Sequence, residues 1–232
     1  MEAISKIFIT LIVLTVIALV VIGSGLIAWR INTKKKITAL FAKKNRSESF
    51  VPSLIKAQML RPVLIRNAVL PEPVGNGSFV NANADLIYIS HGGIAVMSLI
   101  GIPGAVDNSG TGDWTIQNNT GVTTIPNPLE ANAHAVNAIL QILKENSVFN
   151  VPIYNFAVFY GKKTVFRVKS NKLLTAKTLL PSLKDINRDK FLSNQDISDA
   201  YEAIGSYRVK TPKINPAAPK AKAKTASKSK KK

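Results

Sequence analysis

The stretch that decides the fold reads DLIYISHGGIAVMSLI over residues 85–100. Two β-rich runs, at 86–90 and 94–100, flank a short His-Gly-Gly segment, and this pattern predicts two antiparallel strands joined by a tight hairpin. A Trp-Thr pair follows at 114–115, and the sequence NPLEANAH at 127–134 predicts the start of an apolar-periodic helix that reaches about Asn146. Strands followed by a helix indicate an α/β domain.

This order of motifs resembles the nuclease-related (NERD) domain, a branch of the restriction-endonuclease-like superfamily. In that family the first strand opens with an Asp, the second carries Gly-Ile and then a Glu-x-Lys pair, and a Trp-Thr pair and an Asn-Pro-Leu-x-Gln-Asn helix start follow. The positions that match are Asp85, Gly93-Ile94, Trp114-Thr115, Asn127-Pro128-Leu129 and Asn132. The resemblance covers about residues 47–168 and implies a mixed central sheet flanked by helices.

The family's catalytic side chains are missing from the matched positions. Its Glu falls on Ser98, its Lys on Ile100 and its helix Gln on Ala131. Alternate residues of a strand share a face, so a Glu-x-Lys pair delivers a carboxylate and an ammonium to one site. Asp and Glu together would hold a divalent metal, and Lys would stabilise charge on the scissile phosphate. The resemblance therefore implies a nuclease scaffold with no catalytic residue, no metal site and no cofactor.

Two acidic residues offer an alternative with Mg²⁺ as the cofactor. Glu48, within SESFV at 47–51, matches the family's Gly-Glu-x-x-Val helix start except at the glycine, and Glu130 adjoins the lost Gln position. Neither replaces the lysine. Structural interpretations are open for both: Glu48 as a first-turn residue favoured by the helix dipole, and Glu130 as a solvated residue near a helix start. Asp85 is interpreted either as a vestigial site residue or as a strand-edge or turn residue.

The N-terminus predicts a membrane anchor. Residues 7–29 contain no charged side chain, and about 20 apolar residues span a bilayer core as a helix. A cleavable signal peptide is the alternative, although the apolar run is longer than the usual core of such a peptide. Seven cations and no acid lie within residues 30–46. By the positive-inside rule they predict an outside N-terminus and a cytoplasmic domain.

The charge is concentrated at the two ends of the chain. The formal net charge is +18, and 17 of it lies in residues 30–46 and 208–232. The Lys/Ala/Pro-rich tail, predicted at 206–232, is expected to be disordered and to bind anionic partners by counterion release. The tail residues expected to bind are Lys220, Lys222, Lys224, Lys228, Lys230, Lys231 and Lys232. Composition leaves DNA, RNA and anionic lipid open as the partner.

One domain is predicted between these ends, at residues 47–205, after an anchor at 1–30 and a basic segment at 31–46. Helices are expected near 48–60, from 128 and at 195–204, and strands at 63–70, 153–160 and 164–168. Pro71 to Asn83 is expected to be a surface loop. A polar Gly/Asn/Thr stretch follows the hairpin around 107–123. The Asp185/Asn187/Asp189 cluster is interpreted as a solvated turn rather than a calcium loop, because Lys190 replaces the required glycine.

These observations favour a single-pass, membrane-anchored pseudo-nuclease that acts as a binding or scaffold module at the cytoplasmic membrane face. The alternative, from another functional class, is a divergent metal-dependent nuclease with relocated catalytic residues. The chain contains no cysteine, which excludes disulfides, thiolate nucleophiles and zinc-cysteine sites. The protein partner is not identified by any sequence motif.

Overall fold

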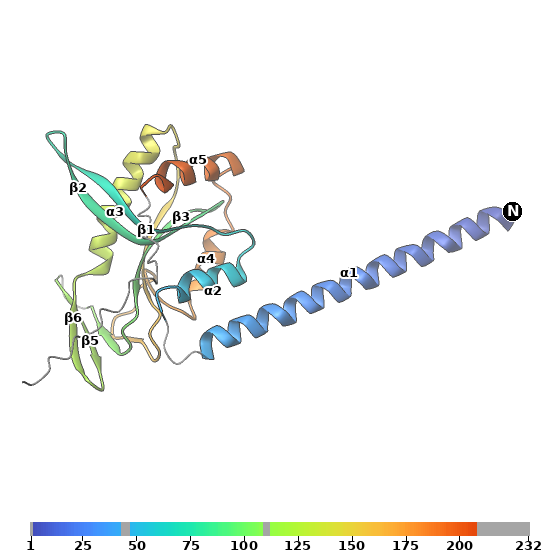
Figure 1. Cartoon of the computed structure of the whole chain (residues 1–232), viewed down its shortest axis with the longest axis horizontal. Coiled ribbons are helices and arrows are strands. Elements are labelled where there is room, and N and C mark those ends of the chain that lie inside the picture. The colour runs from blue at the N-terminus through green and yellow to red at the C-terminus, as the bar shows by residue number, and fades with distance from the viewer. Residues whose placement is uncertain (1, 43–46, 109–111, 208–232) are drawn as a thin grey trace, which may run out of the picture.

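The computed structural model describes residues 2–42, 47–108 and 112–207. Its elements are α1 (Glu2–Ala42), α2 (Phe50–Gln58), β1 (Val63–Gly75), β2 (Ser78–Ser90), β3 (Gly93–Ile100), β4 (Ala105–Asp107), β5 (Trp114–Asn118), β6 (Gly121–Ile125), α3 (Pro128–Glu145), β7 (Ile153–Phe159), β8 (Val165–Phe166), β9 (Leu173–Thr175), α4 (Leu179–Ile186) and α5 (Asn194–Gly205). Helix α1 projects away from a mixed α/β domain that contains all the other elements (Figure 1).

Two mixed sheets form the framework of the domain. The larger sheet has the strand order β1-β2-β3-β7-β9, with β3, β7 and β9 parallel and the other neighbours antiparallel. The smaller sheet has the order β6-β5-β4-β8. The predicted central hairpin is confirmed, because β2 pairs with β3 from Leu86↔Met97 to Ser90↔Gly93. Its turn requires glycine: Gly93 has a φ of 127°, and a Cβ on Gly92 would lie 1.7 Å from the Ile186 carbonyl oxygen.

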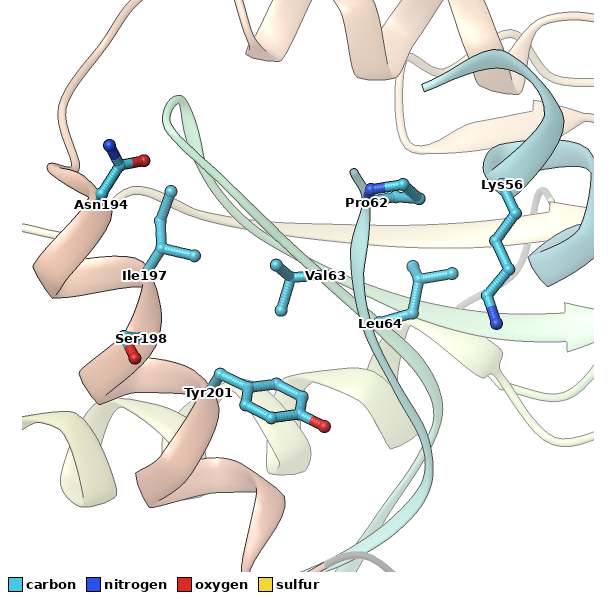
Figure 2. Close-up of a pocket in the computed structure, with 8 residues that line it drawn as sticks. All are labelled: Lys56, Pro62, Val63, Leu64, Asn194, Ile197, Ser198 and Tyr201. Carbon is cyan, nitrogen blue, oxygen red and sulfur yellow. The ribbon is translucent and has the colours of Figure 1, made fainter. Parts of the chain in front are cut away.

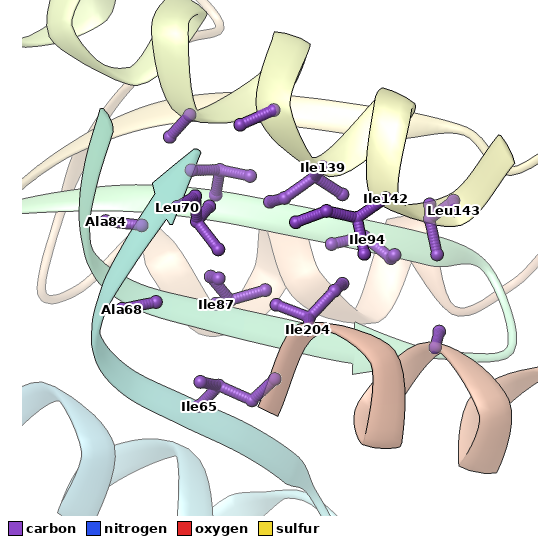
Figure 3. Packing of buried hydrophobic residues seen from close by; sticks show 14 of the residues in the cluster. Ile65, Ala68, Leu70, Ala84, Ile87, Ile94, Ile139, Ile142, Leu143 and Ile204 are labelled. Atoms are coloured by element: carbon purple, nitrogen blue, oxygen red, sulfur yellow. The ribbon is translucent and has the colours of Figure 1, made fainter. Parts of the chain in front are cut away.

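Helices cover both faces of the larger sheet. On one face, Ile139 and Ile142 of α3 and Ile204 of α5 pack against β1, β2 and β3 (Figure 3). On the other face, α2 and α4 bury apolar residues such as Leu54 and Leu183 against the same strands. Apolar residues alternate along β2 and β3, so each face receives every second side chain. A third cluster, which includes Trp114, Ile116 and Phe159, joins the smaller sheet to β7.

The Pro/Gly/Asn-rich stretch at 71–83 is not the surface loop that its composition predicts. It forms the outer half of a long hairpin, because β1 and β2 pair as far as Gly75↔Ser78. Proline is tolerated here since β1 is an edge strand of its sheet. Leu70, Ala82 and Ala84 are buried against α3, and Glu72 accepts hydrogen bonds from that helix. Packing by α3 therefore outweighs the local loop propensity.

The described residues of the polar stretch around 107–123 are largely β-structure. They contribute the end of β4 and most of the β5–β6 hairpin. Trp114 and Ile116 are buried, whereas the alternate residues Thr115 and Gln117 are more exposed. Two apolar side chains at alternate positions were enough to fix the inner face of this hairpin, although Thr, Asn and Gly dominate the composition.

Helix α1 has the length and apolar composition of a membrane span. Among the described residues it is the one helix that passes this test, over Ile17–Ala42, and none of that segment is buried in the structure. A signal sequence near the N-terminus would pass the same test. The last turns of α1 contact the domain through Ile37, Leu40 and Phe41, and the Phe41 ring meets Phe50 edge-on at a centroid distance of 5.6 Å.

Candidate functional site

The larger sheet splits at Asp85 and Ser98. Up to Leu86↔Met97 the strands β2 and β3 pair with each other; beyond that point β2 pairs only with β1, and β3 continues with β7 to Ile100↔Phe159. Where the strands separate, the backbone N–H of Leu99 donates to Asp85 Oδ2 at 2.8 Å. The carboxylate thereby satisfies a strand N–H group near the point where the β2–β3 pairing ends.

A small polar pocket of about 210 Å³ lies beside this split. It is lined by Glu48, Arg66, Asn67, Asp85 and Leu99. Arg66 pairs with Leu86 across the strands, and the register places Asn67 opposite Asp85. Asn67 has a φ of 51°, a left-handed conformation that asparagine adopts more readily than most residues. We call this pocket, with its five lining residues, the acidic pocket.

Glu48 lies in the acidic pocket but not in the first turn of a helix. It occupies the turn before α2, which begins at Phe50 and has no acidic residue in its first turn. The interpretation of Glu48 as a dipole-stabilised first-turn residue is therefore wrong. The Ser47 carbonyl accepts the Phe50 N–H, and Glu48 lies within the turn that this bond closes. Sequence matching did place Glu48 and Asp85 at one site.

The pKa of Tyr160 responds to the charges of both carboxylates. Its side chain is buried, and burial is the main cause that raises the pKa of its phenol above 10.0; the charges of Glu48 and Asp85 raise this pKa further. Gly101 gives the phenol its space, because a Cβ at that position would lie 2.7 Å from the Tyr160 hydroxyl. The charges of both acids therefore act on the phenol of one tyrosine.

Ser98, at the family's Glu position, is bound to helix α3. Its hydroxyl donates to Asn132 Oδ1 at 2.9 Å. Asn132 is fully buried, and its amide nitrogen donates to the Phe156 carbonyl at 2.8 Å. The asparagine thereby links β3, β7 and α3 at the split. The position that would carry a metal-binding carboxylate instead carries a structural hydrogen bond.

Ile100, at the family's Lys position, packs against the third apolar cluster. It is partly buried beside residues that include Trp114 and Phe159. Positions 98 and 100 were expected to share a face of β3, and their contacts agree with this expectation. Ser98 is bonded to Asn132 of α3, and Ile100 packs on the same cluster as Leu129 of α3. An apolar side chain here extends the contact between the two sheets.

The remaining predicted site positions lie outside the acidic pocket. Ala131 and Glu130 are both exposed in the first turn of α3, which Asn127 caps by accepting the Leu129 and Glu130 N–H groups. Glu130 is thus a first-turn residue, as its structural interpretation predicts. The tail lysines from Lys220 to Lys232 lie outside the described residues. Within the described part of the chain, no group of three His, Cys, Asp or Glu residues has metal-binding geometry.

Two residues of the acidic pocket, Arg66 and Asn67, and the nearby Tyr160 were not identified from the sequence. Arg66 and Asn67 lie in an expected strand that carried no motif, and Tyr160 ends the strand-like run 153–160. A polar Arg-Asn pair inside the apolar run 63–70 was the only available signal. It indicates an interruption of the strand, but it does not indicate that the interruption faces Asp85.

The sheet that splits at an aspartate, with helices on both faces, is consistent with a restriction-endonuclease-like fold. The family model described as Nuclease-related domain, NERD, matches residues 43–160, which is half of the chain. The chain belongs to the NERD family. No curated protein and no solved structure shows significant similarity to it.

Proposed function

We propose that this NERD-family protein is held at the membrane by α1 and that its domain binds a partner without hydrolysing nucleic acid. The observation that carries the proposal is the state of the catalytic positions: Ser98 is bonded to Asn132, and Ile100 is packed against the third cluster. Neither side chain supplies a metal ligand of the required charge or an ammonium group for the scissile phosphate. Removing one charge-stabilising group typically costs about 10²- to 10³-fold in rate.

The acidic pocket favours a second candidate, a divergent metal-dependent nuclease. Glu48 and Asp85 supply two carboxylates, which is the number through which protein sites often hold Mg²⁺ together with water and substrate oxygens. Arg66 lines the same pocket and carries the positive charge that Ile100 lacks. One oxygen of Asp85 is already used by the Leu99 N–H. The residues present therefore fit a weak Mg²⁺ site with Glu48 and Asp85 as its ligands.

Metal titration distinguishes the two candidates. The full chain in detergent is titrated with Mg²⁺ or Mn²⁺ by calorimetry, alongside the double variant Glu48→Gln/Asp85→Asn. The binding-module proposal expects equally small heats from both proteins. Saturable binding that the double variant abolishes would favour the nuclease candidate. Glu130→Gln is the matched control, because Glu130 is exposed and lies outside the acidic pocket.

The proposed orientation places the N-terminus outside and the domain in the cytoplasm. It rests on the seven cations of residues 30–46 against Lys6 with Glu2 on the other side of the apolar run. A reporter that is active only in the cytoplasm is expected to be active when it is fused after Lys232. Protease added outside intact cells is expected to leave the domain uncut, and digestion of the domain from outside would contradict the orientation.

The basic tail is proposed to bind polyanions through charge alone. Ten cations and no acid lie within residues 208–232. Deletion of residues 212–232 is expected to weaken binding of the full chain to DNA or RNA, and raising the salt from low to physiological is expected to lower affinity by about 10³-fold or more. Binding that is sequence-selective and insensitive to salt would instead indicate a shaped site in the folded domain.

A further inference from the structure

Three loops form one end of the domain. They are the segment 59–62 before β1, the turn at His91 between β2 and β3, and the segment 187–193 before α5. The His91 carbonyl accepts the N–H groups of Phe191 and Leu192, each at 2.8 Å, and His91 Nδ1 lies 2.8 Å from the Leu192 carbonyl oxygen. A cavity of about 520 Å³ is lined by residues from all three loops, including Leu60, His91 and Lys190.

This end of the domain exposes large apolar side chains. Leu60 is 90% exposed and Phe191 is 55% exposed. Arg61, next to Leu60, has a φ of 47° and precedes a proline, so its backbone is strained in a way that the surrounding structure must maintain. Such strain is concentrated at functional segments more often than elsewhere. We call Leu60, Arg61, His91, Lys190 and Phe191 the three-loop surface.

Cations surround the apolar tips of the three-loop surface. Arg61 and Lys190 belong to it, and Lys56 of α2 borders an adjoining groove of about 430 Å³. Figure 2 shows this groove between α2 and α5, with Val63 and Leu64 of β1 between the two helices. The acids nearby in the chain are Asp185, which is paired with Arg188 at 3.1 Å, Asp196, which accepts hydrogen bonds from Ser193, and Asp189. The surface thus combines exposed apolar side chains with a net positive charge.

The position of α1 identifies what this surface faces. In Figure 1 the 59–62 segment, the β2–β3 turn and the start of α5 lie at the end of the domain toward which α1 projects. If the bilayer ends near Arg30, the remaining turns of α1 to Ala42 span only about 20 Å at 1.5 Å per residue. The Phe41–Phe50 contact holds the base of α1 against the domain. The three-loop surface is therefore within reach of the headgroups.

We propose that the three-loop surface docks on the anionic headgroup layer of the bilayer that α1 crosses. Leu60 and Phe191 enter the interface, and Arg61 and Lys190 contact lipid phosphates. Interfacial binding of this kind requires both buried apolar area and attraction of cations to anionic lipid. The proposal rests on the proposed anchoring by α1. Docking would leave the smaller sheet, whose β5 and β6 lie at the other end of the domain, away from the membrane (Figure 1).

The absence of cysteine from the natural sequence allows a direct test. Full-length single-cysteine variants carry an environment-sensitive fluorophore at Phe191→Cys or Leu60→Cys. The matched control is Val122→Cys, which is 64% exposed on β6 at the other end of the domain (Figure 1). A fourth variant, Val20→Cys, reports on α1 itself, where the native side chain is 65% exposed. Each protein is reconstituted in phosphatidylcholine vesicles with or without phosphatidylglycerol, using lipids with a nitroxide quencher on the headgroup or the acyl chain.

The expected result is strong headgroup quenching of the probes at 60 and 191 in anionic vesicles, at least about twice that of the probe at 122. Acyl-chain quenching of the probe at 20 reports anchoring separately. If the probe at 20 is quenched and those at 60 and 191 behave like the probe at 122, the docking proposal is overturned and anchoring stands. If the probe at 20 is not quenched, the anchoring itself is overturned.

Charge reversal tests the roles of the two cations. Arg61→Glu with Lys190→Glu, in the Phe191→Cys background, is expected to reduce the docked fraction by at least fivefold, because one cation near an anionic surface changes binding about fivefold. The matched control reverses Lys162 and Lys163, which are exposed in the turn after β7 and outside the three-loop surface. Equal loss in the control, or equal quenching in pure phosphatidylcholine, would overturn the assignment of Arg61 and Lys190 as phosphate contacts.

Discussion

The two sides of the split in the larger sheet differ in the chemistry and the burial of their side chains. On the β2 side, Asp85 is exposed, and Glu48 and Arg66 share its pocket. On the β3 side, Ser98 is bonded to a fully buried asparagine and Ile100 adds to an apolar cluster. Residues at the β3 positions therefore contribute to stability, whereas those at the β2 positions remain available to solvent. One half of the site that the family resemblance implies is thus packed into the domain, and the other half faces solvent.

Asn132→Ala is expected to have the largest effect, on the β3 side. The substitution removes the bond to the Phe156 carbonyl, leaves the Ser98 hydroxyl without its 2.9 Å acceptor and opens a buried cavity. The free energy of unfolding is expected to fall by about 2–3 kcal/mol. Chemical denaturation of the full chain in detergent measures it.

Asn137→Ala is the matched control, because Asn137 is exposed on the same helix and donates to Glu72. A loss of about 1 kcal/mol or less is expected there. Equal losses in the two variants would contradict a special structural role for the residue that holds Ser98. Ser98→Ala, at about 1 kcal/mol, is expected to be non-additive with Asn132→Ala because the two side chains share one bond.

Ile100→Lys is expected to have the next largest effect. It restores the family's residue but places an ammonium group beside the cluster that contains Trp114 and Phe159. A loss of about 1–2 kcal/mol in the free energy of unfolding is expected, since the long side chain can carry part of its charge toward solvent. Val122→Lys, on an exposed position of β6, is expected to change the stability by about 0.5 kcal/mol or less. A neutral or stabilising Ile100→Lys would mean that the Lys position is still open.

The β2 side is tested by the titration of Tyr160. Burial and the charges of Glu48 and Asp85 hold the pKa of its phenol above 10.0. Because the unfolded chain loses this proton first, folding stability is expected to fall as the pH rises from about 10 through the raised pKa. Glu48→Gln with Asp85→Asn is expected to lower the Tyr160 pKa without returning it fully, since burial is the larger cause.

Ultraviolet difference titration, with Tyr160→Phe to assign the signal, measures this pKa. Glu130→Gln is expected to leave it unchanged, because Glu130 is exposed in the first turn of α3 and outside the acidic pocket. An unchanged Tyr160 pKa in the Glu48/Asp85 double variant would show that the charges of the two acids do not act on the Tyr160 phenol.

The elements predicted with the best boundaries were those with a strict apolar period. The β2–β3 hairpin follows from the alternation of apolar residues, and helix α3 follows from Asn127-Pro128 at its start. Their predicted boundaries are confirmed within a residue or two, except that β2 begins earlier than predicted, at Ser78. The prediction for residues 71–83 was wrong because the prolines and asparagines of this segment are locally typical of a loop. Only the tertiary contact of Leu70, Ala82 and Ala84 with α3 explains why it is a hairpin.

The candidate site was predictable in part for a similar reason. Motif positions located Asp85, Ser98 and Ile100 on neighbouring strands, and the match at Glu48 placed it near them. The contributions of Arg66, Asn67 and Tyr160 depend on the register between β1 and β2 and on the end of β7. Those relations join residues far apart in the sequence and leave no local pattern.

The most direct test is a nuclease assay of the full chain with Mg²⁺ and with Mn²⁺ on single-stranded DNA, double-stranded DNA and RNA. With Ser98 and Ile100 in place of the metal-binding carboxylate and the ammonium group, no cleavage above that of the buffer is expected, and Asp85→Ala is expected to change nothing. Metal-dependent cleavage by the unaltered chain that Asp85→Ala abolishes would contradict the proposed loss of catalysis and would identify the acidic pocket as an active site.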